Sequence, residues 1–244
     1  QSYRGDGDLL VTSIRSLLDG LGPRSGKVSI TVLSDSGNPV LEEHLAAVKE
    51  MVSPDLLRIV HSRFKHREFF QLYNLYEAFF PFQDARLKAD SYLVKIDADV
   101  IWTDPTRFLD ALDGKPDIVG KEATNYKFLT GLTFTQGGIY AMKISLLRKA
   151  LPVPPRAEDF RDMYARVPHF RQWDSGEDIR VYHYFQKFHP SIRYMPLYPD
   201  APDRFHRQTH CSLHFEGGSH KNRMQAIARS YQGKWDECLQ APGR

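Results

Sequence analysis

The stretch Ser91-Tyr-Leu-Val-Lys-Ile-Asp-Ala-Asp-Val-Ile-Trp102 decides the fold of this 244-residue sequence. Residues 91–96 form a short, mainly apolar run, and two carboxylates, Asp97 and Asp99, follow it directly. A run of this kind predicts a buried β-strand that delivers both carboxylates at its carboxyl end. Because residues i and i+2 of an extended segment project to the same side, we expect the two carboxylates to lie together.

Helices and strands alternate on both sides of this stretch. Leucine and isoleucine at helical spacing predict a helix over 8–21, and alternating β-branched residues predict a strand over 27–35 that ends at Asp35. Asp104-Pro105 is typical of the start of a further helix. The other expected elements are a helix over 39–52, a strand over 56–60, an aromatic-rich helix over 67–82, strands at 118–119 and from 137–138, and a helix over 177–188.

This alternation predicts an α/β fold of Rossmann-like type, with a mostly parallel sheet and helices on both faces. Ligands of such sheets bind at the carboxyl ends of the strands, where Asp35, Asp97 and Asp99 are expected. The sequence opens on a helix, whereas such a unit normally opens on a strand. We therefore expect the first strand to precede Gln1 in the natural protein, and residues 1–244 to form a single domain.

Charge and composition narrow the class of protein. The net charge of +3 is spread along the chain without a block of like charges, which argues against a nucleic-acid partner. No apolar run approaches the roughly 18 to 20 residues that cross a bilayer, so we expect no transmembrane segment within residues 1–244. A cytoplasmic location is expected, with peripheral membrane association as the alternative.

Cys211 and Cys238 are expected to be free thiols, a single bridge being the alternative.

The paired carboxylates are a candidate metal site. Hard oxygen ligands such as Asp97 and Asp99 suit Mg²⁺ or Mn²⁺. Such a metal needs only one or two protein carboxylates when a diphosphate supplies further oxygens, and it then stabilises charge on the departing diphosphate. The alternative is a turn in which the two aspartates cap the helix that follows.

The run Tyr92-Leu-Val-Lys-Ile-Asp-Ala-Asp-Val100 resembles the D-x-D signature of the GT-A nucleotide-sugar glycosyltransferases. The resemblance implies transfer of a sugar from a nucleotide diphosphate sugar, most commonly a UDP-sugar, to a hydroxyl of a glycan, a lipid-linked acceptor or a protein. It implies that Asp97 and Asp99 hold Mn²⁺ or Mg²⁺ and that Asp97 also binds the donor. Residues 1–120 would form the nucleotide-binding half, and residues 121–244 the acceptor-binding half.

Shorter matches to the same family give further site residues. Asp35, in Val32-Leu-Ser-Asp-Ser-Gly37, would hold the donor base or ribose, and Gly138, in Phe134-Thr-Gln-Gly-Gly-Ile-Tyr140, would line the donor pocket. Trp173-Asp-Ser-Gly-Glu-Asp-Ile179 is similar to the x-E-D element of inverting members. There Asp178 would remove the acceptor proton and Glu177 would orient the acceptor. The alternative is an ordinary helix start, where acidic residues are favoured.

A histidine-rich segment near the C-terminus completes the comparison. The resemblance implies that His214 is the third metal ligand and that Lys221 neutralises diphosphate charge. His206, His210 and His220 are the alternatives to His214.

Two other functions fit parts of this pattern. A phosphatase of the haloacid dehalogenase type also carries D-x-D after an apolar strand, although near its N-terminus. A catalytically inactive, carbohydrate-binding relative of the GT-A enzymes would keep the fold and lose the metal or the base. The intact Asp97, Asp99 and Asp178 favour an enzyme.

Overall fold

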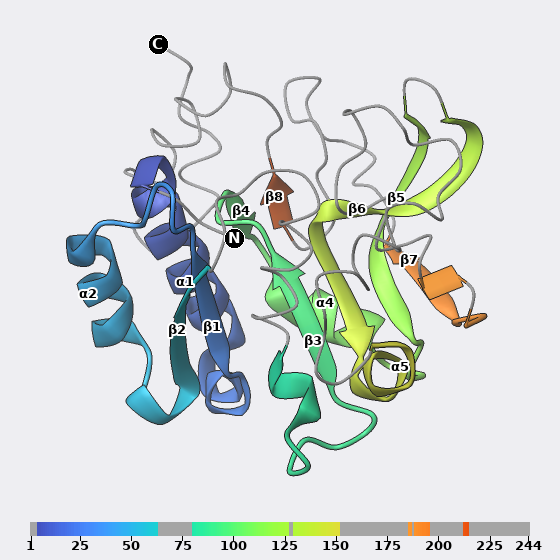
Figure 1. Ribbon diagram of the computed structural model, residues 1–244, viewed down its shortest axis with the longest axis horizontal. Helices are drawn as coiled ribbons and strands as arrows, with labels where there is room; N and C mark the ends of the chain where they lie inside the picture. Colours follow the sequence, from blue (N-terminus) through green and yellow to red (C-terminus); the bar gives the residue numbers. More distant parts are fainter. Residues whose placement is uncertain are drawn as a thin grey trace.

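The structure is a computed structural model that describes residues 4–62, 80–126, 129–151, 185–186, 188–195 and 212–214. Its elements fall into a two-stranded parallel sheet with two helices, a four-stranded mixed sheet, and a short strand pair between them (Figure 1). The expected α/β class is confirmed.

The first half of the described chain follows the sequence prediction closely. It consists of α1 (Gly7–Leu21), β1 (Ile30–Ser34), α2 (Glu42–Met51) and β2 (Leu57–His61). Short 3₁₀ turns lie at η1 (Arg4–Asp6), η2 (Gly22–Lys27), η3 (Pro54–Leu56) and η4 (Phe80–Gln83). Strands β1 and β2 pair in parallel, from Ile30 opposite Leu57 to Ser34 opposite His61. The expected helices and strands between residues 8 and 60 are thus confirmed.

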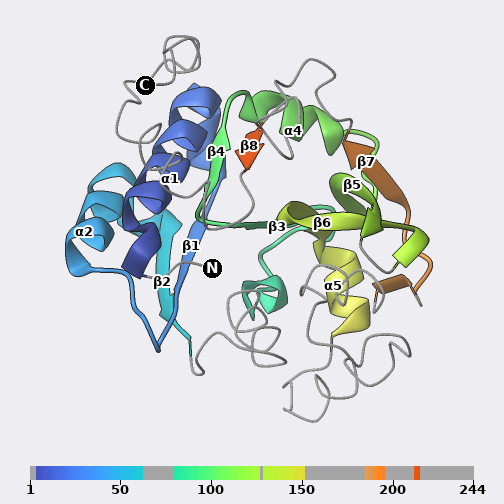
Figure 2. The same cartoon turned by 90° about the horizontal axis from the view of Figure 1, so that it is seen from above.

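Helices α1 and α2 cover one face of this small sheet (Figure 2). Their apolar stripes bury a shared core that includes Leu10, Ile14, Val32, Leu45 and Val48. Each of these side chains contributes roughly 1.5 to 3 kcal/mol by leaving water, so the core accounts for much of the local stability. Leu33 points to the opposite face and joins a different core, as the period of a strand requires.

The larger sheet has the strand order β3-β6-β5-β7. It is built from β3 (Tyr92–Ile96), β5 (Ile118–Tyr126), β6 (Leu129–Lys143) and β7 (Ile192–Met195). Strand β6 is antiparallel to both β3 and β5, whereas β5 and β7 are parallel, so this sheet is mixed where a mostly parallel one was expected. Strand β6 begins at Leu129, well before the strand start expected at Gly137-Gly138, because the apolar and threonine residues of 129–135 suit a strand as well.

Helices α4 (Pro105–Ala111) and α5 (Ile144–Ala150) lie on opposite faces of this sheet (Figure 2). Successive side chains of β6 pack on opposite faces of the sheet. Ile139 and Ala141 pack with Phe108 of α4, and Tyr140 and Met142 pack with Leu147 of α5. The result is a three-layer arrangement in which residues 138–142 of the inner strand β6 are buried on both sides.

Strand β4 (Val100–Trp102) leaves the larger sheet and pairs antiparallel with β8 (Ser212–His214). On its other side the backbone N–H of Trp102 donates to Ser16 Oγ of α1 at 3.1 Å. The Trp102 ring meets Phe108 edge to face, with centroids 5.5 Å apart. Strand β4 therefore contacts α1, α4 and β8.

Asp104 starts α4 as the sequence suggests, since its carboxylate accepts the backbone N–H of Arg107. Within the described part of the chain, no helix is both long and apolar enough to cross a membrane. Residues 67–79 of the expected aromatic helix, and most of the helix expected over 177–188, lie outside the described residues.

Candidate active site at the carboxyl end of β3

Asp97, Ala98 and Asp99 lie in a tight turn between β3 and β4. The Val100 N–H donates to the Asp97 carbonyl at 3.1 Å, which closes the turn. The Asp97 N–H in turn donates to the Gly138 carbonyl of β6 at 2.9 Å. The backbone here is turned and not extended, so the alternation from which we inferred side-by-side carboxylates does not apply. What fixes the two aspartates is the hydrogen bonding of the turn.

Ala98 anchors this turn in the protein core. It is 6% exposed and packs in the same cluster as Leu10 of α1 and Val32 of β1, whereas Asp97 and Asp99 on either side are half-buried. The small side chain of Ala98 lets the turn sit close to the core. Consequently both carboxylates stay partly accessible to a ligand.

Lys95 supplies a positive charge directly beside the turn. It is 5% exposed on β3, and its Nζ lies 2.6 Å from Asp97 Oδ1. The same Nζ lies 5.7 Å from the centroid of the Tyr140 ring. Sequence reasoning missed this residue, although a lysine inside an otherwise apolar strand, two residues before an aspartate, was a usable signal.

Asp35 lies at the carboxyl end of β1, as expected, and is 4% exposed. Its Oδ1 accepts the backbone N–H groups of Gly37 at 2.7 Å and Asn38 at 3.0 Å. This pattern is the turn that aspartate side chains commonly build after a strand. The carboxylate thus shapes the loop between β1 and α2, and its contact with a donor remains a prediction.

Serine side chains complete the same loop. Ser34 Oγ accepts the N–H of Val40 at 3.1 Å, and Ser62 Oγ accepts the N–H of Ser36 at 2.9 Å. The Ser62 N–H donates back to the Ser34 carbonyl, which continues the β1–β2 pairing past the strand ends. The loop is therefore held at both ends, as a preformed binding loop would be.

The β4–β8 pair brings the predicted third ligand to the turn. His214 is opposite Val100 in this pair, so its backbone lies next to the residue that follows Asp99. Gly138 is also beside the turn, through its carbonyl bond to Asp97. Glu177, Asp178 and Lys221 lie outside the described residues, as do the alternatives His206, His210 and His220 and the two cysteines.

The residues at the turn fit a divalent cation that a diphosphate helps to hold. Among the side chains that the structure describes, no three carboxylate, imidazole or thiol groups converge into a complete site. Two carboxylates at a strand end are nevertheless what Mg²⁺ or Mn²⁺ needs when phosphate oxygens fill the remaining positions. The donor set of Asp97 and Asp99 is of this kind.

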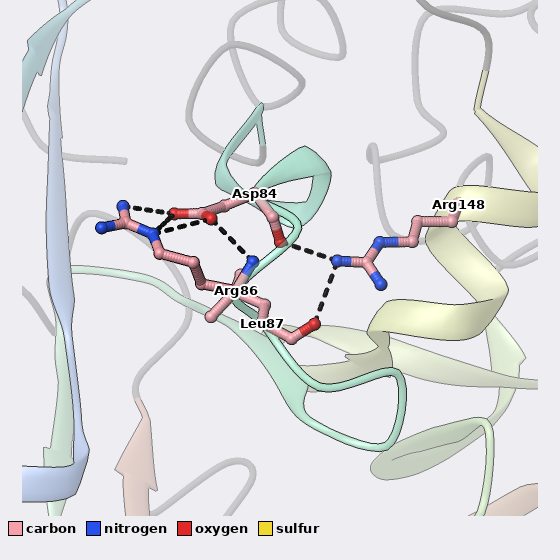
Figure 3. Close-up of polar contacts among 4 residues, drawn as sticks. All are labelled: Asp84, Arg86, Leu87 and Arg148. Atoms are coloured by element: carbon pink, nitrogen blue, oxygen red, sulfur yellow. Dashed lines mark hydrogen bonds and ion pairs between the residues drawn. The ribbon is translucent and has the colours of Figure 1, made fainter.

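The segment that leads into β3 is fastened to α5 by Arg148 (Figure 3). Its Nη2 donates to the carbonyls of Asp84 at 2.7 Å and Leu87 at 3.1 Å, and its Nε donates to Phe82 at 2.9 Å. In the same loop the Asp84 carboxylate pairs with Arg86, whose hydrogen bond lowers the pKa of Asp84 to about 2. These contacts set the starting point of β3 and therefore the position of the turn at its far end.

Comparison with known proteins shows a similarity to solved structures. The sequence matches no protein-family model and no curated protein. Among solved structures the chain is similar to the mannosyltransferase PcManGT from Pyrobaculum calidifontis in complex with GDP-Man and Mn²⁺, at 18% identity and a TM-score of 0.41. The match covers 64% of this chain and 47% of that chain, about half the length of the mannosyltransferase. A similarity of this size decides nothing about activity.

Proposed function

We propose that the chain is a metal-dependent glycosyltransferase that moves a sugar from a nucleotide diphosphate sugar to an acceptor hydroxyl. The donor class that fits the resemblance best is a UDP-sugar, and the acceptor is a glycan, a lipid-linked sugar or a protein. The transfer is inverting, with Asp178 as the base.

One observation carries this proposal. The D-x-D turn follows β3 directly, its central Ala98 is buried, and its two carboxylates are half-buried at the carboxyl end of the strand. The alternative of two aspartates that merely cap the next helix finds no support, because Asp104 is the residue that caps α4. Capping of α4 therefore does not account for Asp97 and Asp99.

The chain's own residues have the following roles. Asp97 and Asp99 hold Mn²⁺ or Mg²⁺, with His214 as the third ligand from β8. Asp35 and Gly138 bind the donor, and Lys221 faces its phosphates. The bound metal would neutralise the charge that develops on the departing diphosphate.

We assign proton transfer to the acidic pair in the acceptor-binding half, residues 121–244. Asp178 accepts the proton of the acceptor hydroxyl as that oxygen attacks the anomeric carbon, and Glu177 orients the acceptor.

Calorimetry tests the donor and metal assignments. The protein is titrated in Mn²⁺ with UDP, GDP and their sugar conjugates, alongside Asp99→Asn and, as the matched control, Asp113→Asn on an exposed loop. Micromolar, metal-dependent binding of one nucleotide to the wild type and to Asp113→Asn, abolished in Asp99→Asn, is the expected result. Equal behaviour of all three proteins, or binding without metal, would refute the assignment.

A second measurement separates the transferase from its rivals. Incubation of the protein with the nucleotide sugar that binds should release the nucleotide diphosphate, by transfer or by slow hydrolysis. Donor binding without any turnover would favour an inactive carbohydrate-binding relative. Hydrolysis of a simple phosphomonoester with no nucleotide binding would favour a phosphatase.

A further inference from the structure

Lys95 is a buried ammonium group placed against a carboxylate that we assign to the metal. It occupies the next-to-last position of β3 and lies on the face of the sheet that α5 covers, with Leu93 and Tyr140 on the same face. A charge in such surroundings is costly unless an opposite charge accompanies it. Asp97 Oδ1, 2.6 Å from the Lys95 Nζ, provides that charge.

This pair changes how strongly Asp97 attracts a cation. A carboxylate with an ammonium group at contact distance has little net charge left to attract Mn²⁺. The ammonium group also repels a divalent cation a few ångströms away, by enough to lower its affinity at least about tenfold even at the dielectric constant of water. Among the side chains that the structure describes, no third acidic group joins the two aspartates to offset this repulsion.

We propose, resting on the function above, that Lys95 is a positioning residue that keeps the Asp97–Asp99 site weak for a metal alone. It holds the carboxylate of Asp97 in place while the site is free. The diphosphate of the donor supplies the additional negative charge that metal binding needs. Metal and donor therefore bind together. After transfer, the nucleotide diphosphate and the metal leave together for the same reason.

The test compares the affinity for Mn²⁺ alone in the wild type, Lys95→Met and Lys95→Arg, with free Mn²⁺ counted by electron paramagnetic resonance. Methionine has a similar length and suits the apolar face, whereas arginine keeps the charge. We expect Lys95→Met to bind Mn²⁺ at least about tenfold more tightly than the wild type. Lys95→Arg should remain as weak as the wild type.

The direction in which Lys95→Met changes the Mn²⁺ affinity distinguishes this role from a merely structural one. If Lys95 did no more than hold Asp97 in a shape that binds metal, Lys95→Met would bind Mn²⁺ more weakly. A weaker or unchanged affinity overturns the proposal. Circular dichroism shows whether Lys95→Met is folded, and Lys95→Gln, the second neutral variant, takes its place if it is not.

A second arm repeats the Mn²⁺ titration with saturating UDP and, in parallel, GDP. The nucleotide should strengthen Mn²⁺ binding far more in the wild type than in Lys95→Met, whose site no longer depends on the added charge. A wild type that binds neither nucleotide would refute the transferase function. The comparison of free Mn²⁺ between the wild type and Lys95→Met would still decide the role of Lys95.

Discussion

Ser16 Oγ accepts the backbone N–H of Trp102 at 3.1 Å, so a helix side chain replaces a neighbouring strand along the free edge of β4. Ser16 is 1% exposed and Trp102 is 2% exposed, so water cannot easily take the place of either partner. The same hydroxyl donates to the Ser13 carbonyl within α1. One serine thus connects the first helix to the strand that follows the D-x-D turn.

Ser16→Ala is expected to lower the free energy of unfolding by about 1 to 3 kcal/mol, because it leaves the buried Trp102 N–H without an acceptor. The measurement is urea unfolding followed by fluorescence or circular dichroism. Thr12→Val is the matched control, since the Thr12 hydroxyl donates to the Asp8 carbonyl of its own helix turn. Equal losses in the two variants would contradict the role given to Ser16.

Enlarging Ala98 should disturb the turn that carries the carboxylates. Ala98→Leu adds volume to a packed cluster and is expected to cost about 1 to 3 kcal/mol of unfolding free energy. Because the turn must then shift outward, we also expect weaker metal-dependent nucleotide binding. Ala46→Leu, on the exposed side of α2, is the control and should change neither quantity. Unaltered nucleotide binding in Ala98→Leu would show that the turn tolerates displacement.

Gly20 allows α1 and α4 to approach each other closely. A Cβ at Gly20 would lie 2.4 Å from Pro105 Cδ, whereas a Cβ at Gly26 would meet nothing within 4 Å. The proline ring cannot rotate away, so Gly20→Ala should lower the melting temperature through a displaced α4. Gly26→Ala should leave it nearly unchanged. A larger drop in melting temperature for Gly26→Ala than for Gly20→Ala would mean that α4 shifts freely.

The Asp84–Arg86 pair predicts a specific pH dependence. Since Arg86 lowers the pKa of Asp84 from 3.8 to about 2, the ionised form is favoured in the folded state. This stabilisation is fully present above pH 3.8 and is lost as the pH falls through about 2. Carboxyl carbon NMR should give a midpoint near 2 in the wild type and a higher one in Arg86→Met. An unshifted midpoint in Arg86→Met would assign the effect to other groups.

Local patterns made much of the first half predictable. The leucine spacing of α1, the β-branched residues of β1 and the apolar run of β3 each specify an element within a few residues. Asp35 and the D-x-D pair accordingly lie at the strand ends where the sequence places them. Such features depend on neighbours in the chain, and for that reason periodicity detects them.

Features that depend on distant pairing were not predictable in the same way. No local signal indicates that β4 pairs with β8, or that β6 lies between β3 and β5. The roles of Glu177, Asp178 and Lys221 stay predictions, because those residues lie outside the described part of the chain.

The β4–β8 pair also has a consequence for how the protein is made. Ser212 pairs with Trp102 although residues 103–211 lie between them, so the pair can form only after residue 212 has left the ribosome. Closing so long a loop is entropically unfavourable and comes late unless other contacts have already drawn its ends together. Until then the edge of β4 that β8 will occupy has unpaired amides, which could bond to another chain. We therefore expect the site proposed at the D-x-D turn to be completed late in folding, and truncation after Met195 should remove β8 from it while sparing α1, β1, α2 and β2.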